Sequence, residues 1–417
     1  MKKKKSELIT GIDIGSTAIR VAVGQYVTDG KGEGELRIIG AVEVASTGVS
    51  KGVINSIEEA ISSVSHSLEQ IERLIGSPIE HTWVGITGSH VISQESKGVI
   101  SVAKTDGEIS GEDMERAIEA ARMIVTPLNY EIMHVIPRSF IVDGQTGIKD
   151  PVGMTGMRLE VNTQIIHGLS SHLKNVHKTI YRTGIGIDDV VLSIVATGDV
   201  VSTAKQKELG VAVVNIGGSI TSMVVYEGGD IIHSAVLPVG SEHITNDLAL
   251  GLRTSINVAE RVKIQYGSCN PKTVDKKNKI VINGSDDTEE LVTLRYISEI
   301  VDARVSEILE MIDKELDSIG RSGLLPAGAI FTGGGSKITG LTELAKNILR
   351  LPVILGYPID IQSISPKSND LSFVSAIGLV KWGTNIYHGG KHDNPVLANT
   401  VNKVWKNFRK IWKWLMP

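Results

Sequence analysis

Residues 8–24, LITGIDIGSTAIRVAVG, join two apolar runs through the glycine turn Asp13-Ile-Gly-Ser-Thr17. A similar turn, Asn215-Ile-Gly-Gly-Ser219, joins two apolar runs in the second half of the chain. Glycine lets a backbone approach a phosphate closely, and the hydroxyl and N–H groups of such a turn donate hydrogen bonds to its oxygens. One such turn alone is typical of an ordinary hairpin. Because two of them can face each other across one nucleotide, the pair favours a phosphate site.

A third glycine cluster strengthens this interpretation. Gly333-Gly334-Gly335-Ser336 follows the apolar segment AGAIFT and precedes a helical pattern. Alone it would be a simple connection between a strand and a helix, but beside the other two turns it is interpreted as the loop for the base and sugar. Asp13 adds a carboxylate at a strand end, where it can hold Mg²⁺ through water. The alternative for Asp13 is a turn-forming aspartate that bonds its own backbone.

Length and composition set limits on the function. At 417 residues the chain is too long for one ordinary core and suggests two or more domains. A net charge of −4 with 22% charged residues indicates a soluble protein with no general affinity for nucleic acid. The single cysteine, Cys269, excludes an intrachain disulfide and fits a reducing cytosol. No apolar stretch approaches the roughly 20 residues that span a bilayer.

The two halves follow one plan. Strands are predicted at 8–14, 18–25 and 36–46, followed by a helix from Ile57 that stops at Gly76. The second half repeats this order with strands at 211–216, 220–226 and 231–237 and a helix near 242–252. The pattern indicates an internal duplication of architecture at low sequence identity.

Two insertions interrupt this plan. The first is predicted to be a β-α-β-β module, in which Ser110 and Asp113 resemble a capping box at the start of a helix. The second contains a long amphipathic helix predicted near 289–319. The resulting domains are a first lobe (1–88 and 172–205), an inserted subdomain (89–171), a second lobe (206–242 and 326–387), a second insertion (243–325), a linker (388–400) and a terminal helix (401–417).

The terminal segment TVNKVWKNFRKIWKWLMP is predicted to form an amphipathic helix that lies in the membrane plane. Its apolar residues fall within one arc of the helix. Basic residues, which are expected to lie among anionic lipid headgroups, occupy much of the remaining helix surface. A helix docked on the protein's own core, or a target helix for another protein, are the alternatives. The expected membrane residues are Val401, Val404, Trp405, Lys406, Phe408, Arg409, Lys410, Ile411, Trp412, Lys413 and Leu415.

The chain resembles the actin, Hsp70 and sugar-kinase superfamily in the order of five segments. These are the three glycine segments, VLSIVATG at 191–198 and AERVKIQYG at 259–267. The subdomain inserted in the first lobe and the terminal helix make the chain similar to the FtsA family of bacterial cell-division proteins. This resemblance implies an α/β, two-lobed, actin-like ATPase fold that binds ATP with Mg²⁺. The implied ATP-site residues are Asp13, Gly15, Ser16, Thr17, Arg20, Asn215, Gly217, Gly218, Ser219, Glu260, Lys263, Gly333, Gly334, Gly335 and Ser336.

The same resemblance implies partners and a location. FtsA proteins self-associate into filaments and tether FtsZ at the division septum, on the cytoplasmic face of the membrane, as peripheral proteins. They receive the FtsZ C-terminal peptide on the second insertion, where Arg295 and Arg304 are candidate contacts, although a solvated helix face is equally compatible with both. Later division proteins are expected to bind through the inserted subdomain.

Two departures from the superfamily pattern bear on catalysis. Most relatives carry Asp at the head of the second turn, where this chain has Asn215, and Asp189 aligns with the water-orienting glutamine of actins. We therefore expect firm ATP binding with weak hydrolysis, because phosphoryl transfer depends on positioning and charge compensation. Three alternatives remain: an FtsA-like pilus assembly platform, a sugar-kinase-type phosphotransferase, and a chaperone of the Hsp70 kind.

Overall fold

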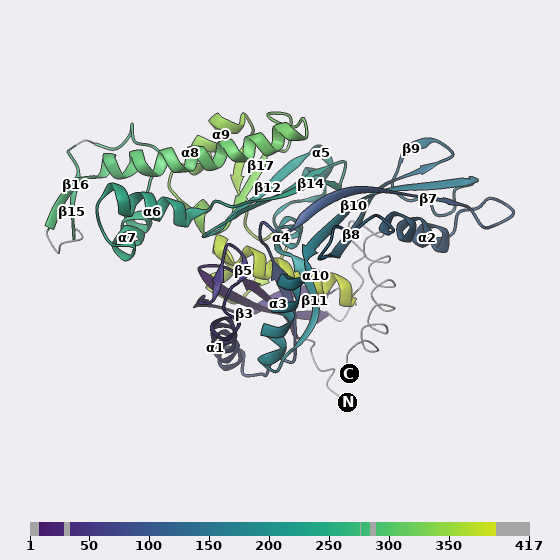
Figure 1. The fold of residues 1–417 in the computed structure, drawn as a ribbon, viewed down its shortest axis with the longest axis horizontal. Coiled ribbons are helices and arrows are strands. Elements are labelled where there is room, and N and C mark those ends of the chain that lie inside the picture. The colour runs from purple at the N-terminus through teal and green to yellow at the C-terminus, as the bar shows by residue number, and fades with distance from the viewer. Residues whose placement is uncertain (1–7, 29–33, 276, 284–288, 389–417) are drawn as a thin grey trace.

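The computed structural model describes residues 8–28, 34–275, 277–283 and 289–388. Figure 1 shows a central body with two arms that extend to opposite sides. One arm carries β15 (Lys279–Asn283), β16 (Glu289–Thr293) and the start of α8 (Leu294–Ser318), and the other carries the inserted subdomain with α2 (Gly111–Arg122). The predicted terminal helix and residues 389–400 of the predicted linker lie outside the described residues. None of the described helices combines the length and apolar character that a membrane span requires.

Two sheets with the same strand directions form the body, as the predicted duplication requires. In each sheet the first three strands along the chain pair in antiparallel fashion, and the later strands join in parallel. The first sheet has the order β11 (Gly186–Leu192), β6 (His81–Ile86), β1 (Leu8–Ile14), β2 (Ala18–Thr28), β3 (Gly34–Ala45) and β19 (Gln362–Ser363). The second has the order β14 (Asp230–Leu237), β13 (Thr221–Glu227), β12 (Val211–Ile216), β17 (Ala329–Thr332) and β18 (Val353–Leu355).

Helices cover the outer faces of both sheets. The first sheet packs against α1 (Ile57–Ile75) and α3 (Ser170–Arg182), whose apolar residues share one core with the strands. The second packs against α6 (Ser241–Gly251), α7 (Ile256–Tyr266), α8 and α9 (Leu341–Leu349). The short elements of the described residues also include β4 (Val49–Ser50), β5 (Val53–Ile54), α5 (Ala204–Leu209) and the 3-10 helices η1 (Gly334–Lys337), η2 (Pro366–Asn369) and η3 (Leu371–Phe373).

Two helices lie between the sheets and share a third core with both of them. α4 (Ser193–Val201) packs against β11, β12 and β13, and α10 (Val374–His388) packs against β1, β2 and β6. The predicted assignment of 326–387 to the second lobe therefore needs a correction, because α10 lies on the first sheet. α10 is buried on nearly every side, so its sequence pattern does not indicate which sheet it covers.

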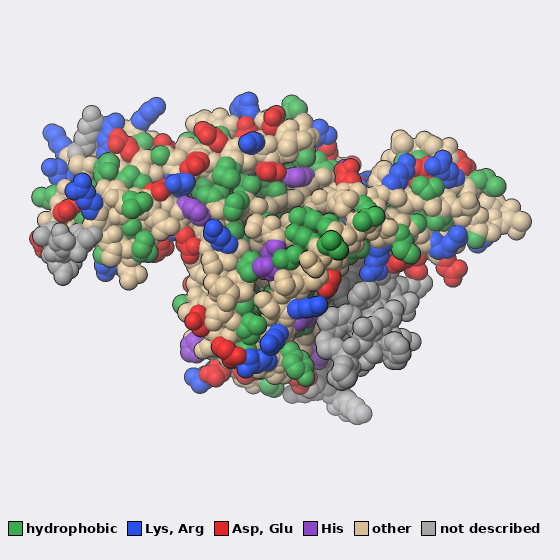
Figure 2. Space-filling view, in the orientation of Figure 1, with side chains coloured by type: hydrophobic (Ala, Val, Ile, Leu, Met, Phe, Trp, Pro, Cys, Tyr) green, Lys and Arg blue, Asp and Glu red, His purple; other side chains and the backbone are tan. Residues whose placement is uncertain are grey.

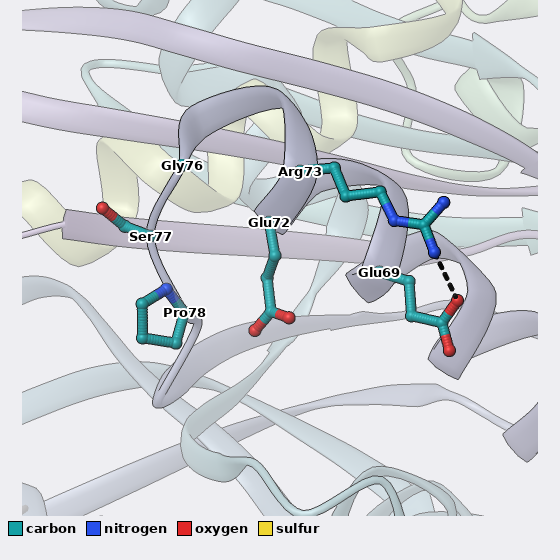
Figure 3. A pocket seen from close by; sticks show the side chains of 6 residues that line it. All are labelled: Glu69, Glu72, Arg73, Gly76, Ser77 and Pro78. Atoms are coloured by element: carbon teal, nitrogen blue, oxygen red, sulfur yellow. Dashed lines mark ion pairs between the residues drawn. The ribbon is translucent and has the colours of Figure 1, made fainter.

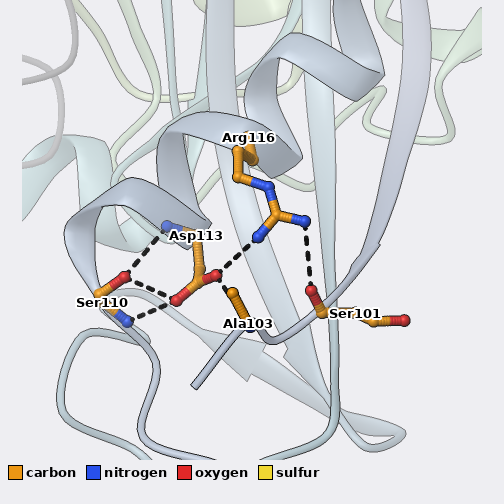
Figure 4. A network of polar contacts seen from close by, with 5 residues as sticks. All are labelled: Ser101, Ala103, Ser110, Asp113 and Arg116. Carbon is orange, nitrogen blue, oxygen red and sulfur yellow. Dashed lines mark hydrogen bonds and ion pairs between the residues drawn. The ribbon is translucent and has the colours of Figure 1, made fainter.

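The inserted subdomain has a four-stranded antiparallel sheet in the order β7 (Ile92–Ser101), β10 (Arg158–Leu169), β8 (Tyr130–Val142) and β9 (Gln145–Ile148). The predicted capping box at the start of α2 is confirmed: the Asp113 N–H donates to Ser110 Oγ at 3.3 Å, and the Ser110 N–H donates to Asp113 Oδ2 at 3.0 Å (Figure 4). Arg116 Nη1 and the Ala103 N–H donate to the other carboxylate oxygen. The hydroxyl of Ser110, above all, lowers the pKa of Asp113.

The second insertion differs from prediction at one point. Residues 289–293, predicted as the start of the long helix, form β16, which pairs with β15. The helix begins only at Leu294, because Thr293 caps it by accepting a hydrogen bond from the Tyr296 N–H at 3.2 Å.

Candidate functional site

The two glycine turns have the same backbone geometry. In the first, the Gly15 N–H donates to the Ala18 carbonyl at 3.2 Å; in the second, the Gly217 N–H donates to the Ile220 carbonyl at 2.9 Å. The registers match as well, since Asp13 lies opposite Arg20 and Asn215 lies opposite Ser222. The two turns are therefore equivalent positions of a duplicated hairpin.

The two turns also face each other. A Cβ atom placed on Gly218 would lie 2.5 Å from Cγ2 and 3.1 Å from Oγ1 of Thr17. Both distances are shorter than ordinary van der Waals contact. Glycine at 218 therefore allows the second turn to approach the first.

The turns offer backbone donors to an anion. Within the described ranges, no hydrogen-bond partner is found for the N–H groups of Ser16, Thr17, Gly218 and Ser219. Successive N–H groups of this kind form an anion-binding concavity. The geometry thus fits the phosphates of a nucleotide between the lobes.

The third glycine segment packs against the second turn. Gly333 has a φ of 87°, and a Cβ atom there would lie 2.2 Å from Asn215 Oδ1. A Cβ atom on Gly335 would lie 2.4 Å from Cγ2 of Ile216. Ser336, by contrast, is buried and donates its hydroxyl to the Thr332 carbonyl, so this hydroxyl is used within the protein.

Charged side chains of the first lobe lie beside the first turn. Asp13, Arg20 and Glu43 lie opposite one another on β1, β2 and β3, and Arg20 Nε donates to Glu43 Oε2 at 2.6 Å. Burial raises the pKa of Asp13, while Arg20 and a hydrogen bond from Ser193 oppose the rise. Because an ionised carboxylate is costly to bury, a cation bound beside Asp13 would stabilise its charged form.

The donor set fits a magnesium ion that is held mainly by water and phosphate. Among the residues that the structure describes, no group of three or more His, Cys, Asp or Glu side chains is placed to hold a metal ion. Mg²⁺ usually keeps several waters and takes one or two carboxylates together with substrate phosphates. Asp13 supplies one such carboxylate, and Asn215 at the equivalent position supplies an uncharged amide.

Glu260 and Lys263 on α7 are joined to the second turn through α6. Lys263 Nζ donates to the Ser241 carbonyl at 3.3 Å and to Glu260 Oε2 at 2.7 Å. The Ser241 N–H in turn donates to the Gly217 carbonyl at 2.9 Å. The structure therefore links this predicted pair to the second turn through Ser241.

Asp189 does not join the cluster. It lies in β11 opposite Trp83, whereas Asp13 lies opposite Gly85, two positions further along β6. Its side chain is buried, and Oδ1 accepts from the Val190 N–H at 2.6 Å. Burial raises the pKa of Asp189 well above its usual range.

Ser193, the first residue of α4, contacts Asp13 instead of Asp189. Its hydroxyl donates to Asp13 Oδ1 at 3.1 Å. Ser193 lies within the VLSIVATG segment, but nothing in that segment distinguishes it from its neighbours. Glu242, whose carboxylate accepts from the Ser219 hydroxyl, is a second missed residue, and it became apparent only through the packing of α6 on the second turn.

The two arginines predicted to bind a partner lie on α8 and are both paired. Arg295 Nε donates to Glu299 at 3.0 Å, and Arg304 makes a forked contact with Asp247. Figure 2 shows Lys and Arg side chains at the outer end of the same arm. Exposed lysines of this region are Lys272, Lys277 and Lys279.

A separate pocket of about 350 Å³ lies at the C-terminal end of α1 (Figure 3). Its lining residues are Glu69, Glu72, Arg73, Gly76, Ser77 and Pro78. One carboxylate oxygen of Glu72 accepts from the Ile79 N–H at 2.7 Å, and Arg73 pairs with Glu69. This pocket includes none of the glycine-turn residues.

Comparisons with known proteins agree with this geometry. Residues 212–378 match the family described as cell division protein FtsA, and residues 88–167 match the SHS2 domain inserted in FtsA. The cell division protein FtsA of Bacillus subtilis is 35% identical over 90% of this chain and 83% of its own length. That of Pseudomonas aeruginosa is 31% identical over 91% of this chain and 90% of its own length.

Solved structures show the same fold at low identity. A chain of the PilM–PilN type IV pilus biogenesis complex has a TM-score of 0.64 at 16% identity, with 90% of this chain and 98% of that chain covered. MreB5 of Spiroplasma citri bound to ADP has a TM-score of 0.53 at 14% identity, with 92% and 99% covered. The two-lobed, actin-like fold with an inserted subdomain is thereby confirmed.

Proposed function

The chain belongs to the FtsA family of cell-division proteins, and on that premise we propose that it binds ATP with Mg²⁺ between its two lobes and tethers FtsZ filaments to the membrane. The observation that carries the nucleotide site is the approach of Gly218 to Thr17, which sets two equivalent turns face to face. MreB5, which shares the fold, was solved with ADP and with AMPPNP, and this supports the same ligand class.

Each part of the site has a role in this proposal. The N–H groups of Ser16, Thr17, Gly218 and Ser219 bind the phosphate oxygens from both lobes. Asp13 orients the waters of the cation, and bound Mg²⁺ would neutralise charge on the phosphates. Residues 333–335, which pack against the second turn, are proposed to contact the sugar and base, as are Lys263 and Glu260.

Hydrolysis should be slow. The amide of Asn215 brings no charge to the second turn, and the described geometry gives Asp189 no contact with the turns. Phosphoryl transfer without charge compensation and an aligned water is weakly catalysed. Phosphate release from the parent protein should therefore remain close to the uncatalysed rate at saturating ATP.

The membrane and partner roles rest on the sequence. The predicted terminal helix is the anchor, and the acidic C-terminal peptide of FtsZ is proposed to bind the basic outer end of the second insertion. Since Arg304 is held by Asp247 and Arg295 by Glu299, the exposed lysines of that arm are the better first contacts. Self-association would add avidity, because several anchors on one filament meet the surface at high effective concentration.

Two measurements test the proposal. Isothermal calorimetry with MgATP should show one binding site per chain, and absence of uptake would remove the nucleotide role. Sedimentation with anionic liposomes should pellet the full chain but not a chain ending at Asn399, and equal pelleting would remove the anchor. The fold likeness to the PilM–PilN chain keeps a pilus platform as the second candidate, which binding of an FtsZ peptide would exclude.

A further inference from the structure

A path of hydrogen bonds that is buried at its centre connects the two turns. Ser193 Oγ donates to Asp13 Oδ1 at 3.1 Å, and Thr197 Oγ1 donates to the Ser193 carbonyl at 2.8 Å. Thr197 Oγ1 also lies 3.0 Å from Ser375 Oγ, and Asn215 Nδ2 lies 2.8 Å from the same oxygen. Five residues from four elements thus link the first turn to the second.

The chemistry of each group fixes the direction of the path. An ionised carboxylate and a backbone carbonyl only accept, and each hydroxyl has one hydrogen to donate. Ser193 and Thr197 have therefore used their hydrogens, so Ser375 must donate to Thr197. The Asn215 amide must then donate to Ser375. Every bond points from the second turn toward Asp13, and the orientation of the amide is determined by its partners.

The path crosses the region where the lobes meet. Ser193 and Thr197 lie on α4, Ser375 lies on α10, and all three are buried. The two helices approach closely enough that a Cβ atom on Gly378 would lie 2.4 Å from the Ala196 carbonyl oxygen. Buried polar groups of this kind are costly when one member is removed, because the remaining partner is left unsatisfied.

We propose that this path is a latch between the lobes, in which Asn215 and Ser375 are positioning residues that set the second turn relative to the Asp13 carboxylate. The proposal rests on the nucleotide site described above and assigns a reason for an amide at position 215. A carboxylate there would accept the hydrogen of Ser375. Neither hydroxyl would then have a hydrogen left for the contact between Ser375 and Thr197, unless Thr197 stopped donating to the Ser193 carbonyl.

The latch and a simple cation role for position 215 predict opposite results for Asn215→Asp. If Asn215 is only a weakened cation neighbour, the new carboxylate should tighten Mg²⁺-dependent ATP binding. If Asn215 is a latch donor, the variant should bind MgATP at least about fivefold more weakly, although it carries an added negative charge. Tighter binding by this variant would overturn the latch.

A double-mutant cycle tests the coupling directly. Asn215→Ala and Ser375→Ala should each weaken MgATP binding at least about fivefold, and the double variant should bind no more weakly than the worse single variant. The change at Ser375 is informative because its hydroxyl is shared between Asn215 and Thr197 in the interior. Additive losses, or an unchanged Ser375→Ala variant, would refute the proposal.

Thr197 supplies a matched pair for the centre of the path. Thr197→Ser keeps the hydroxyl and should retain the affinity of the parent, whereas Thr197→Val keeps the shape and should lose it. Equal affinities for these two variants would contradict the latch, even where Ser375→Ala fails to fold.

The same cycle followed by urea unfolding, without nucleotide, separates the latch from the proposed function. If the parent takes up no ATP, the nucleotide role fails on its own. The latch then stands if the shifts in unfolding midpoint for Asn215→Ala and Ser375→Ala are non-additive, and falls if they add.

Discussion

The two turns of the proposed site approach each other at Gly218, and Gly218→Ala tests this contact. The added Cβ atom would lie 2.5 Å from Thr17 Cγ2, whereas carbon atoms in good contact are about 3.5–4.0 Å apart. The turns would have to separate by roughly 1 Å or more. Overpacking of this kind costs about 1–3 kcal/mol, which corresponds to roughly a 5- to 150-fold loss of affinity.

Calorimetric titration with MgATP measures that loss. Thr17→Ala should restore binding in the Gly218→Ala background, because it leaves only the Thr17 Cβ position, 3.4 Å from the new atom. Gly111→Ala is the matched control, since a Cβ atom at Gly111 meets nothing within 4 Å. Unchanged affinity in Gly218→Ala, or failure of the second change to restore it, would refute the face-to-face arrangement.

Three further outcomes are expected. Asp13→Asn should abolish Mg²⁺-dependent ATP binding yet stabilise the free protein. Burial raises the pKa of Asp13, so ionising this carboxyl in the folded parent lowers its stability. The urea midpoint of the variant should therefore equal that of the parent below the ordinary carboxyl pKa and exceed it increasingly as pH rises. Gly333→Ala should lower unfolding free energy by about 1–3 kcal/mol, because its φ of 87° and the Asn215 side chain both oppose a Cβ atom, while Gly334→Ala should change little. Asp113→Ala should cost about 0.5–2 kcal/mol through loss of the capping box and speed proteolysis of the inserted subdomain, with ATP affinity unchanged.

Local patterns explain why much of the fold was predictable. The two hairpins, the capping box at Ser110 and the repeated strand order follow from apolar runs interrupted by glycine and hydroxyl residues. These signals act over a few residues and are visible in the sequence. The position of α10 was not predictable in this way, because a helix that is apolar on almost all sides gives no preferred face.

The candidate site shows the same limit. Asp13 and Asn215 were found because they begin recognisable turns, whereas Ser193 and Ser375 matter only through partners that are distant in sequence. Asp189 was placed at the site by alignment. A register irregularity between Ile187 and Asp189 leaves Asp189 opposite Trp83. Ser193, which directly follows the strand end at Leu192, contacts Asp13 instead.

A crystal structure with Mg²⁺ and a non-hydrolysable ATP analogue tests the central claim most directly. We expect the triphosphate between residues 13–17 and 215–219, within hydrogen-bond distance of the N–H groups of Gly218 and Thr17, with the sugar beside Gly333. An analogue bound outside the cleft, for example in the pocket at the end of α1, or contacting only one of the two turns, would contradict it.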